Sequence, residues 1–388
     1  MFEIVEAQSQ DAIIKVIGVG GCGGNAVDHM ITEGVLGVEF IAINTDAQAL
    51  KRNKARCQLQ IGASITKGLG AGAVPDVGRA AAEEDRARIT ELIKGANMVF
   101  ITAGMGGGTG TGAAPIVAQV AKELGILTVA VVTKPFAHEG KRTRLAQAGI
   151  EALTEHVDSL IIVPNEKLMT VLGEDTTLLD AFRASNSVLQ GAVGGIAEVI
   201  NVPGLVNVDF ADVRTLMSEN GMAMMGSATA SGPTRAKDAA QRALSSPLLE
   251  DVDLAGARGV LVNISSSNGL TMKEYREVTN SVQFAAEDAT VIVGSVFDEG
   301  MGDDLRVTIV ATGLGSPAER RQSKPVLAYE EQKRTGTHDE PAPAVNYREL
   351  DAIPAVIRSG RHREAVEAMR QSGVEMLDIP SFLRKQAD

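Results

Sequence analysis

The chain has 388 residues, 44% of them hydrophobic, and a formal net charge of −12. This length and composition are ordinary for a globular protein with a sizeable core, and a typical domain size of about 150 residues predicts two to three domains. The negative charge, an aromatic content of 3% and the lack of tryptophan argue against a nucleic-acid partner.

Cysteine usage and hydropathy indicate the compartment. Cys22 and Cys57 are the only cysteines, so we expect no disulfide framework and a reducing cytosol. The N-terminal residues lack the basic and apolar pattern of a signal peptide. No apolar run approaches the ~18 residues that cross a bilayer, so we expect no membrane insertion.

Strand and helix patterns alternate through the first half of the chain. Apolar runs predict strands at 12–20, 38–46, 58–61, 97–103, 126–133 and 159–163. Helical patterns predict helices at 25–33, 47–53, 76–94, 113–124 and 141–156, the fourth with Pro115 in its first turn. This alternation predicts an α/β fold with a Rossmann-like parallel sheet, whose ligand crevice lies at the carboxyl ends of the strands.

A long, largely apolar helix is predicted at 178–200, where it would join two α/β parts. After it, predicted helices at 211–220, 234–244 and 271–286 alternate with predicted strands at 222–230, 259–265, 290–297 and 305–311. This pattern indicates a second, smaller α/β domain. The segment 298–304 is typical of a turn, so we expect the last two strands to form an antiparallel hairpin.

The composition changes after Gly315. Five prolines among charged residues in 316–357 predict a disordered linker. The last residues are apolar and basic again, which indicates either a partner-binding peptide or a frayed terminus. The predicted organisation is a nucleotide-binding domain at 11–177, a central helix at 178–201, an α/β domain at 202–315, a linker at 316–374 and a tail peptide at 375–388.

Three glycine-bearing loops follow predicted strands. The segment 18–25 (GVGGCGGN) contains G-x-G-x-x-G, and Asp46 loosely fits the acidic residue of a dinucleotide site. The segment 104–112 (GMGGGTGTG) joins a strand directly to a helix and is typical of a backbone nest for polyphosphate, with hydroxyls from Thr109 and Thr111. The third loop, 68–73, would lie at the same sheet edge. No Walker motif occurs, so three such loops favour a nucleoside triphosphate held by backbone amides.

These motifs resemble the tubulin/FtsZ family of GTPases. The signature is GGGTGTG at 106–112, and the segments 19–25, 44–46, 68–73, 133–136 and 207–212 are similar to further family motifs in the same order. The tail 378–385 (DIPSFLRK) is similar to the tail peptide of the family's bacterial cell-division members. The resemblance covers about 11–315 and the tail, and it implies a GTPase domain joined by a central helix to a smaller, GTPase-activating α/β domain.

The resemblance implies which residues contact GTP or GDP. Glu139 and Arg142 would contact ribose and phosphate, and Arg144 is the alternative to Arg142 because 139–144 is one residue shorter than the family pattern. Phe182 would stack on guanine, while Asn165 and Asn186 would pair with its edge. The full implied set is Gly20, Gly21, Cys22, Gly23, Gly24, Asn25, Asn44, Asp46, Gly70, Ala71, Gly72, Gly104, Gly106, Gly107, Gly108, Thr109, Gly110, Thr133, Glu139, Arg142, Asn165, Phe182 and Asn186.

Several of these residues have simpler interpretations. An aromatic side chain on an apolar helix, such as Phe182, is more often part of the core. Asn165 could start a helix after Pro164, and Asp46 could cap the helix that follows it. Glu139 and Arg142 could be solvated surface charges.

Catalysis needs groups that the glycine loops lack. The resemblance implies that Asn207, Asp209 and Asp212 enter the nucleotide pocket of the next subunit, where the two carboxylates polarise water for attack on the γ-phosphate. Mg²⁺ would offset the phosphate charge. Such head-to-tail contacts do not close, so they build a dynamic filament, the division ring of bacterial members. The alternative from the residues alone is that Asp209 only caps the following helix.

Two other functions compete with an assembling GTPase. An NAD-dependent oxidoreductase could use Gly18 to Gly23, although the loop 104–112 is then unexplained. A nucleotide-binding scaffold without turnover would not need Asp209 and Asp212.

The resemblance also implies partners and a location. The chain would associate with itself, act in the cytoplasm at the mid-cell division site, and bind membrane-tethering and regulatory division proteins through its tail. The tail residues implied are Asp378, Ile379, Pro380, Phe382, Leu383, Arg384 and Lys385.

Overall fold

The computed structural model describes residues 12–173, 176–202, 204, 208–218, 221–249, 254–286 and 288–314. Asn207, the predicted linker 316–374 and the predicted tail 375–388 lie outside this described part. All described residues fall in one compact unit of the chain. Within them, no helix is both long and apolar enough to cross a membrane.

The amino-terminal half alternates strands and helices, as the sequence pattern predicts. Its strands are β1 (Ile14–Val19), β2 (Glu39–Asn44), β3 (Cys57–Gln60), β4 (Met98–Gly104), β5 (Leu127–Lys134) and β6 (Ser159–Pro164). Its helices are α1 (Gly20–Thr32), α2 (Ala47–Arg52), α3 (Ala63–Thr66), α4 (Pro75–Glu84), α5 (Arg86–Ile93), α6 (Thr109–Glu123), η1 (Ala137–Glu139), α7 (Lys141–Thr154) and α8 (Asn165–Leu172).

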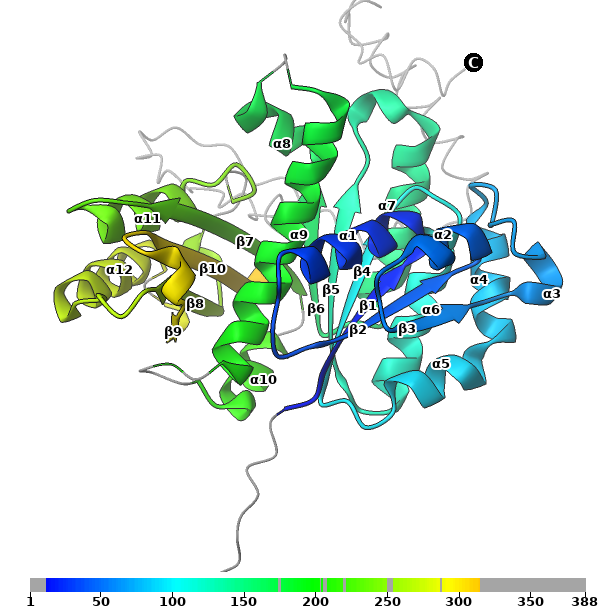
Figure 1. Cartoon of the computed structure of the whole chain (residues 1–388), viewed down its shortest axis with the longest axis horizontal. Coiled ribbons are helices and arrows are strands. Elements are labelled where there is room, and N and C mark those ends of the chain that lie inside the picture. Colours follow the sequence, from blue (N-terminus) through cyan, green and yellow to red (C-terminus); the bar gives the residue numbers. More distant parts are fainter. Residues whose placement is uncertain are drawn as a thin grey trace, which may run out of the picture. The chain divides into compact units, whose positions relative to one another are not determined.

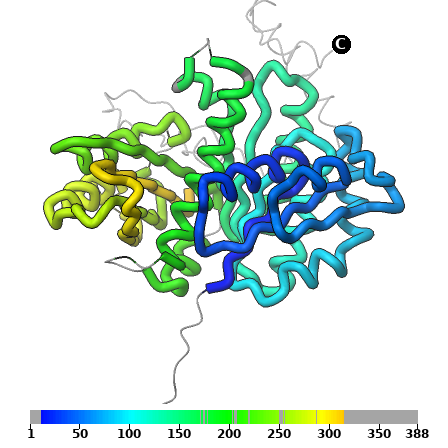
Figure 2. The backbone as a smooth tube through the Cα atoms, in the orientation of Figure 1, coloured from blue at the N-terminus to red at the C-terminus, as the bar shows by residue number. Residues whose placement is uncertain are grey.

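The carboxyl-terminal half continues with a 24-residue helix, α9 (Leu178–Asn201). After it come α10 (Phe210–Met217), β7 (Gly221–Ala230), α11 (Arg235–Leu244), η2 (Leu254–Gly256), β8 (Gly259–Ser266), α12 (Met272–Ala285), β9 (Thr290–Phe297), η3 (Glu299–Met301) and β10 (Leu305–Leu314). Figure 2 follows the chain from the blue amino-terminal part, through α9 in green, to the yellow carboxyl-terminal part.

The ten strands form one sheet in the order β3-β2-β1-β4-β5-β6-β7-β10-β8-β9. The pairs from β3 to β7 are parallel, and β7 joins β6 through a short register of residues 159–161 with 221–223. β10 is antiparallel to both β7 and β8, and β8 is parallel to β9. The amino-terminal strands are thus a doubly covered parallel sheet, which brings their carboxyl ends to one edge.

Apolar side chains on both faces of the sheet hold the layers together. Residues from α1, α9 and α10 pack on one face, while residues from α4 to α7 pack on the other. A third cluster joins α11 and α12 to β7, β8 and β10. Figure 1 shows α9 between the two parts of the sheet, with α8 and α10 at its opposite ends.

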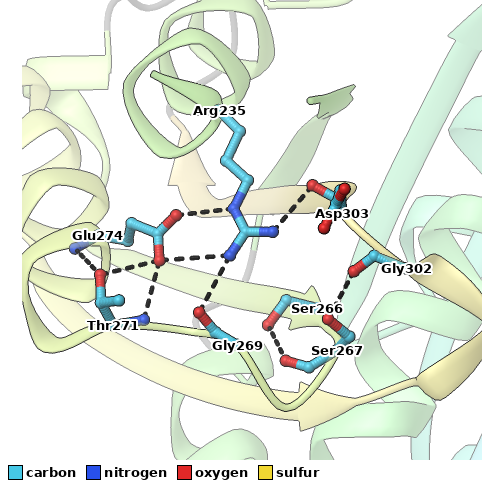
Figure 3. Close-up of polar contacts among 8 residues, drawn as sticks. All are labelled: Arg235, Ser266, Ser267, Gly269, Thr271, Glu274, Gly302 and Asp303. Atoms are coloured by element: carbon cyan, nitrogen blue, oxygen red, sulfur yellow. Dashed lines mark hydrogen bonds and ion pairs between the residues drawn. The ribbon is translucent and has the colours of Figure 1, made fainter. Parts of the chain in front are cut away.

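An ion pair with backbone contacts ties together helices and loops beside the carboxyl-terminal strands of the sheet (Figure 3). Arg235 Nε donates to Glu274 Oε1 across 2.7 Å, and its Nη1 and Nη2 donate to the carbonyls of Asp303 and Gly269. Glu274 also accepts from Thr271 in a capping box that starts α12. One guanidinium therefore connects α11, α12 and the loop before β10.

The predicted hairpin of the last two strands is wrong. β9 and β10 are not neighbours, because β9 follows the crossover helix α12 and pairs in parallel at the outer edge of β8. β10 then lies between β7 and β8, each of which offers it an antiparallel edge. The alternation of strands and helices could not distinguish these two arrangements.

Two predicted helices also differ from the structure. The helix predicted at 76–94 is split into α4 and α5 at Asp85, whose buried carboxylate accepts from the backbone N–H of Gly62 and from Arg88. Helix α6 begins at Thr109 rather than 113, so Pro115 lies inside it and not in its first turn. The last residues of the glycine loop are thus already helical.

Candidate nucleotide-binding site

Two helix N-termini lie side by side at the carboxyl edge of the sheet. β1 leads directly into α1 and its neighbour β4 leads through the glycine loop into α6. Neither cap residue, Val19 or Gly108, makes a side-chain cap, and neither helix has an acidic residue in its first turn. Free N–H groups and the positive ends of two helix dipoles therefore converge, which favours an anion such as a polyphosphate.

A cavity of about 540 Å³ opens in front of these helix ends. Its walls come from the start of α1, the 104–110 loop, the segment after β5 and the first half of α9. The lining residues are Val19, Gly21, Cys22, Asn25, Gly104, Met105, Gly106, Gly107, Gly108, Thr109, Gly110, Thr133, Pro135, Glu139, Arg142, Asn165, Leu179, Phe182, Arg183, Ser185 and Asn186. The size is that of a small-molecule site.

Close backbone contacts shape the 104–112 loop. Gly106 has φ +97°, and a Cβ there would lie 2.8 Å from the carbonyl oxygen of Arg142. A Cβ on Gly108 would lie 2.9 Å from the Cβ of Ala71, so the third glycine loop approaches this one as expected. Only glycine allows both approaches.

The two threonines of this loop have different roles. Thr109 lines the cavity, and its hydroxyl shares a 2.7 Å hydrogen bond with that of Thr45. Thr111 is buried, and its Oγ1 accepts from the backbone N–H of Gly106 across 2.8 Å. Thr111 does not line the cavity, and its side chain holds the loop in shape.

The first glycine segment is the start of a helix rather than a loop. Gly21, Cys22 and Asn25 face the main cavity. Gly20, Gly24 and Asn44, together with Gly21 and Asn25, line a smaller cavity of about 180 Å³ between α1 and α2. Gly23 is buried against the carbonyl of Thr102, so it serves packing.

Cys22 is a neutral group in the first turn of α1, where it lines the cavity. Burial raises the pKa of its thiol, while the hydrogen bond with Thr133, at 3.7 Å, acts in the opposite direction and is the smaller effect. A protonated thiol brings no negative charge close to an anionic ligand.

The far end of the cavity carries the predicted base contacts. Phe182 is 47% exposed, so the interpretation as a core residue is wrong. Its ring lies edge-on to that of Phe136, with centroids 6.3 Å apart. Asn165 is buried at the start of α8, and its Oδ1 accepts from Ser185 Oγ across 3.1 Å. Asn186 lies on the same wall.

A charged pair stands at the rim. Arg142 Nη1 donates to Glu139 Oε2 across 2.8 Å, and Glu139 Oε1 accepts from the backbone N–H of Phe136. Both residues line the cavity, whereas Arg144 is exposed and does not line it. Of the two arginines that the sequence left open, Arg142 is the one at the cavity.

Some predicted residues lie outside the lining. Asp46 caps α2, its Oδ1 accepting from the backbone N–H groups of Gln48 and Ala49, as the simpler interpretation expected. Gly70 and Gly72 lie in the neighbouring loop and do not line the cavity. Ala71 is also outside the lining and lies beside Gly108.

The structure also adds lining residues that the sequence analysis missed: Val19, Met105, Pro135, Leu179, Arg183 and Ser185. Helical spacing could have found two of them, because Leu179 and Arg183 lie on the same face of α9 as Phe182 and Asn186.

Asp209 and Asp212 lie at the other end of α9. A 24-residue helix spans about 36 Å, and α10, which follows Asp209, lies at the end of α9 opposite to α8 (Figure 1). Asp209 occupies the cap position of α10, yet its side chain makes no cap hydrogen bond. Both carboxylates are exposed, and within the described ranges neither makes a hydrogen bond or an ion pair.

The cavity lining fits a metal ion only together with a phosphate ligand. Glu139 is its one carboxylate, and that group already pairs with Arg142. In the part of the chain that the structure describes, no three His, Cys, Asp or Glu side chains are grouped as metal ligands. Mg²⁺ commonly keeps its waters and binds through substrate phosphates, and such an ion suits this donor set.

Comparison with known proteins decides the family. Residues 13–173 match the model of the tubulin/FtsZ family GTPase domain, and residues 221–315 match that of the FtsZ family C-terminal domain. The chain belongs to the tubulin/FtsZ family. It is therefore a member of a family of GTPases, and this assignment replaces the interpretation of the first glycine segment as an NAD site.

Similar proteins cover the whole chain. It is 58% identical to the cell division protein FtsZ of Pseudomonas aeruginosa over 100% of both chains, and 57% identical to that of Coxiella burnetii over 99% of both. Among solved structures, an empty FtsZ dimer from M. jannaschii is 45% identical, with a TM-score of 0.76 over 79% of this chain and 89% of the other. CetZ2 from Haloferax volcanii, at 21% identity and TM-score 0.65, shares the fold.

Proposed function

We propose that this chain binds GTP in the 540 Å³ cavity and hydrolyses it only after assembling head to tail, when the next copy contributes Asp209 and Asp212. The observation that carries this proposal is the separation of binding and acidic groups. The cavity has the N–H groups for a polyphosphate but only a paired carboxylate, whereas the two unpaired carboxylates project from the opposite end of α9.

GTP suits the cavity along its whole length. The triphosphate would lie against the N-termini of α1 and α6, with backbone N–H groups as donors. The guanine would stack on Phe182, and the amides of Asn165 and Asn186 can both donate and accept at its polar edge. Arg142 would supply positive charge near the phosphates or ribose.

The catalytic step would then take place at the contact between two copies. Asp209 and Asp212 lie three residues apart, on one face of the start of α10. Placed near the γ-phosphate of a neighbour, these carboxylates would orient and polarise the attacking water, and Asn207 would help to align it. When bound to the phosphates, Mg²⁺ offsets their negative charge.

Assembly of this kind gives a filament. A contact between the cavity end of one copy and the α10 end of the next is heterologous and leaves both outer ends open. The relatives from Pseudomonas aeruginosa and Coxiella burnetii are cell division proteins, and the FtsZ of M. jannaschii was solved as a dimer. Hydrolysis at each contact would weaken it and make the polymer dynamic, as a cytoplasmic division ring at mid-cell requires.

The carboxyl-terminal tail would link such a ring to other proteins. We propose that Ile379, Phe382 and Leu383 anchor it on membrane-tethering and regulatory division proteins, with Arg384 and Lys385 adding charge. A chain truncated before residue 375 should then polymerise with GTP but fail to localise as a ring.

The test of the proposed function uses Asp209→Asn and Asp212→Asn. Each variant should bind GTP and scatter light on adding GTP and Mg²⁺, while phosphate release falls at least a hundredfold. Wild-type turnover by both variants would contradict the proposal. Glu299→Gln, an acidic-to-amide change at an exposed residue of η3 that lies outside the cavity lining, is the matched control.

A further inference from the structure

The last residue of α9 is fastened to the amino-terminal sheet by its side chain. Asn201 Nδ2 donates to the carbonyl oxygen of Gly37 across 2.7 Å and to that of Ala12 across 2.9 Å. Gly37 lies between α1 and β2, and Ala12 lies just before β1. One amide group therefore joins three segments that are far apart in the sequence.

The chemistry of this contact requires an amide nitrogen. Both partners are carbonyl oxygens, which only accept, so both hydrogens of the Asn201 amide are used. An aspartate here would place a carboxylate against two carbonyl oxygens. The loop side is also constrained, because Gly37 has φ +76° and a Cβ on it would lie 2.9 Å from the Cβ of Asn201.

The acidic segment starts directly after this contact. Helix α9 ends as Val202 N–H bonds to the carbonyl of Glu198, and Val208, next to Asp209, is buried beside Val199 and Gly294. Further along, Arg214 Nη2 donates to the carbonyl of Gly125, which ties α10 to the loop between α6 and β5. The side chain of Asn201 is thus one of the contacts that fix the end of α9, eight residues before Asp209.

We infer that Asn201 is a positioning residue for hydrolysis: it fixes the end of α9, eight residues before Asp209, so that Asp209 and Asp212 are presented to the nucleotide of the neighbouring copy. This inference rests on the proposed function. In the proposed function, the side chain of Asn201 itself does not touch the substrate. The nucleotide cavity lies roughly 20 Å away, since fifteen residues of α9 separate Asn201 from Asn186.

The test separates turnover from binding. For purified full-length Asn201→Ala and Asn201→Asp, phosphate release at saturating GTP and Mg²⁺, per mass of sedimented polymer, should fall roughly tenfold, because small misplacements of a catalytic group are costly. The dissociation constant for GTP should stay within twofold of the wild type. Gly37→Ala, which disturbs the same contact from the loop side, should lower turnover in the same way.

The control is Gln241→Ala, which removes an exposed amide on α11 that makes no side-chain hydrogen bond within the described residues. Unchanged turnover in both Asn201 variants would overturn the inference, and so would a parallel tenfold loss of GTP binding, which would indicate a general structural role. If Asp209→Asn and Asp212→Asn lose turnover while the Asn201 variants keep it, only this inference fails. If the aspartate variants also keep it, the proposed function fails.

Discussion

Arg142 donates to Glu139 across 2.8 Å at the rim of the nucleotide cavity, and the same glutamate accepts from the backbone N–H of Phe136. Glu139 therefore holds the guanidinium at the cavity and also fixes the loop that carries Phe136. Because the pair is largely open to solvent at Arg142, the ion pair itself adds little to stability. Its importance is the placement of one positive charge beside the proposed phosphates.

Arg142→Ala should weaken GTP binding by about tenfold or more, since a hydrogen bond to a charged group contributes about 1.5–3 kcal/mol. Arg144→Ala is the matched control, because Arg144 is exposed and outside the cavity lining. Titration of each variant with a fluorescent GTP analogue checks this. Equal losses of GTP affinity in both variants would show that long-range charge, and not direct contact with Arg142, attracts the nucleotide.

Phe182→Ala should weaken GTP binding by about tenfold or more and leave the midpoint of thermal unfolding nearly unchanged. The ring is 47% exposed and offers a stacking surface, and stacking of a base on an aromatic side chain contributes about 1–3 kcal/mol. Phe284→Ala, with an 84% exposed ring on α12, is the control for removal of an exposed aromatic. A large drop in the unfolding midpoint for Phe182→Ala would mean that the ring supports the fold instead.

The free energy of unfolding should depend on pH through Glu274. The hydrogen bond from Arg235 lowers the pKa of Glu274 from 4.5 to about 2. Because the folded-state pKa lies below the unfolded value, this stabilisation is present above about pH 4.5 and is lost as the pH falls toward 2. Glu274→Gln should therefore flatten the decline in stability between these values.

Denaturant unfolding of the wild type and Glu274→Gln at pH 6, 4 and 3 measures this effect. Glu277→Gln, on the more exposed next turn of α12, is the control. Parallel declines for the wild type and both variants would contradict the assignment of this pH dependence to the Arg235–Glu274 contact.

Specific GTPase activity should rise steeply with protein concentration and then level off, because a single copy lacks the carboxylates at its own cavity. Phosphate release per molecule, measured across a hundredfold range of concentration, checks this expectation. A constant value would indicate that each copy contains a complete site.

Local sequence patterns predicted most of the fold and much of the cavity. The glycine loop at 104–112 could be placed because a strand and a helix bound it directly, and the resemblance to a family then pointed to Phe182 and Asn165 on distant elements. Sequence patterns gave the wrong structure where tertiary contacts determine strand pairing or helix ends. The pairing of β10 depends on which strand edges are free, and the break at Asp85 depends on its bond to Gly62, 23 residues earlier.

The roles of individual side chains within a correctly predicted motif could not be predicted from the sequence either. Thr109 and Thr111 are two residues apart in the same loop, yet one faces the cavity and the other bonds the N–H of Gly106. The contact between Asn201 and Gly37 spans 164 positions and carries no motif. Such contacts depend on the complete backbone, and sequence spacing does not encode them.

The most direct test that two copies share one GTPase site is to mix two inactive variants and measure phosphate release. In the first variant, Gly107→Glu, a new carboxylate would enter the cavity and block GTP binding. A Cβ at position 107 meets no atom within 4 Å, so this variant should still fold. The second variant, Asp212→Ala, keeps the cavity and lacks the Asp212 carboxylate. If the site is shared between copies, mixing the variants should restore a substantial fraction of wild-type phosphate release, because Asp212 of one then faces GTP held by the other. A mixture no more active than its separate components would contradict the claim.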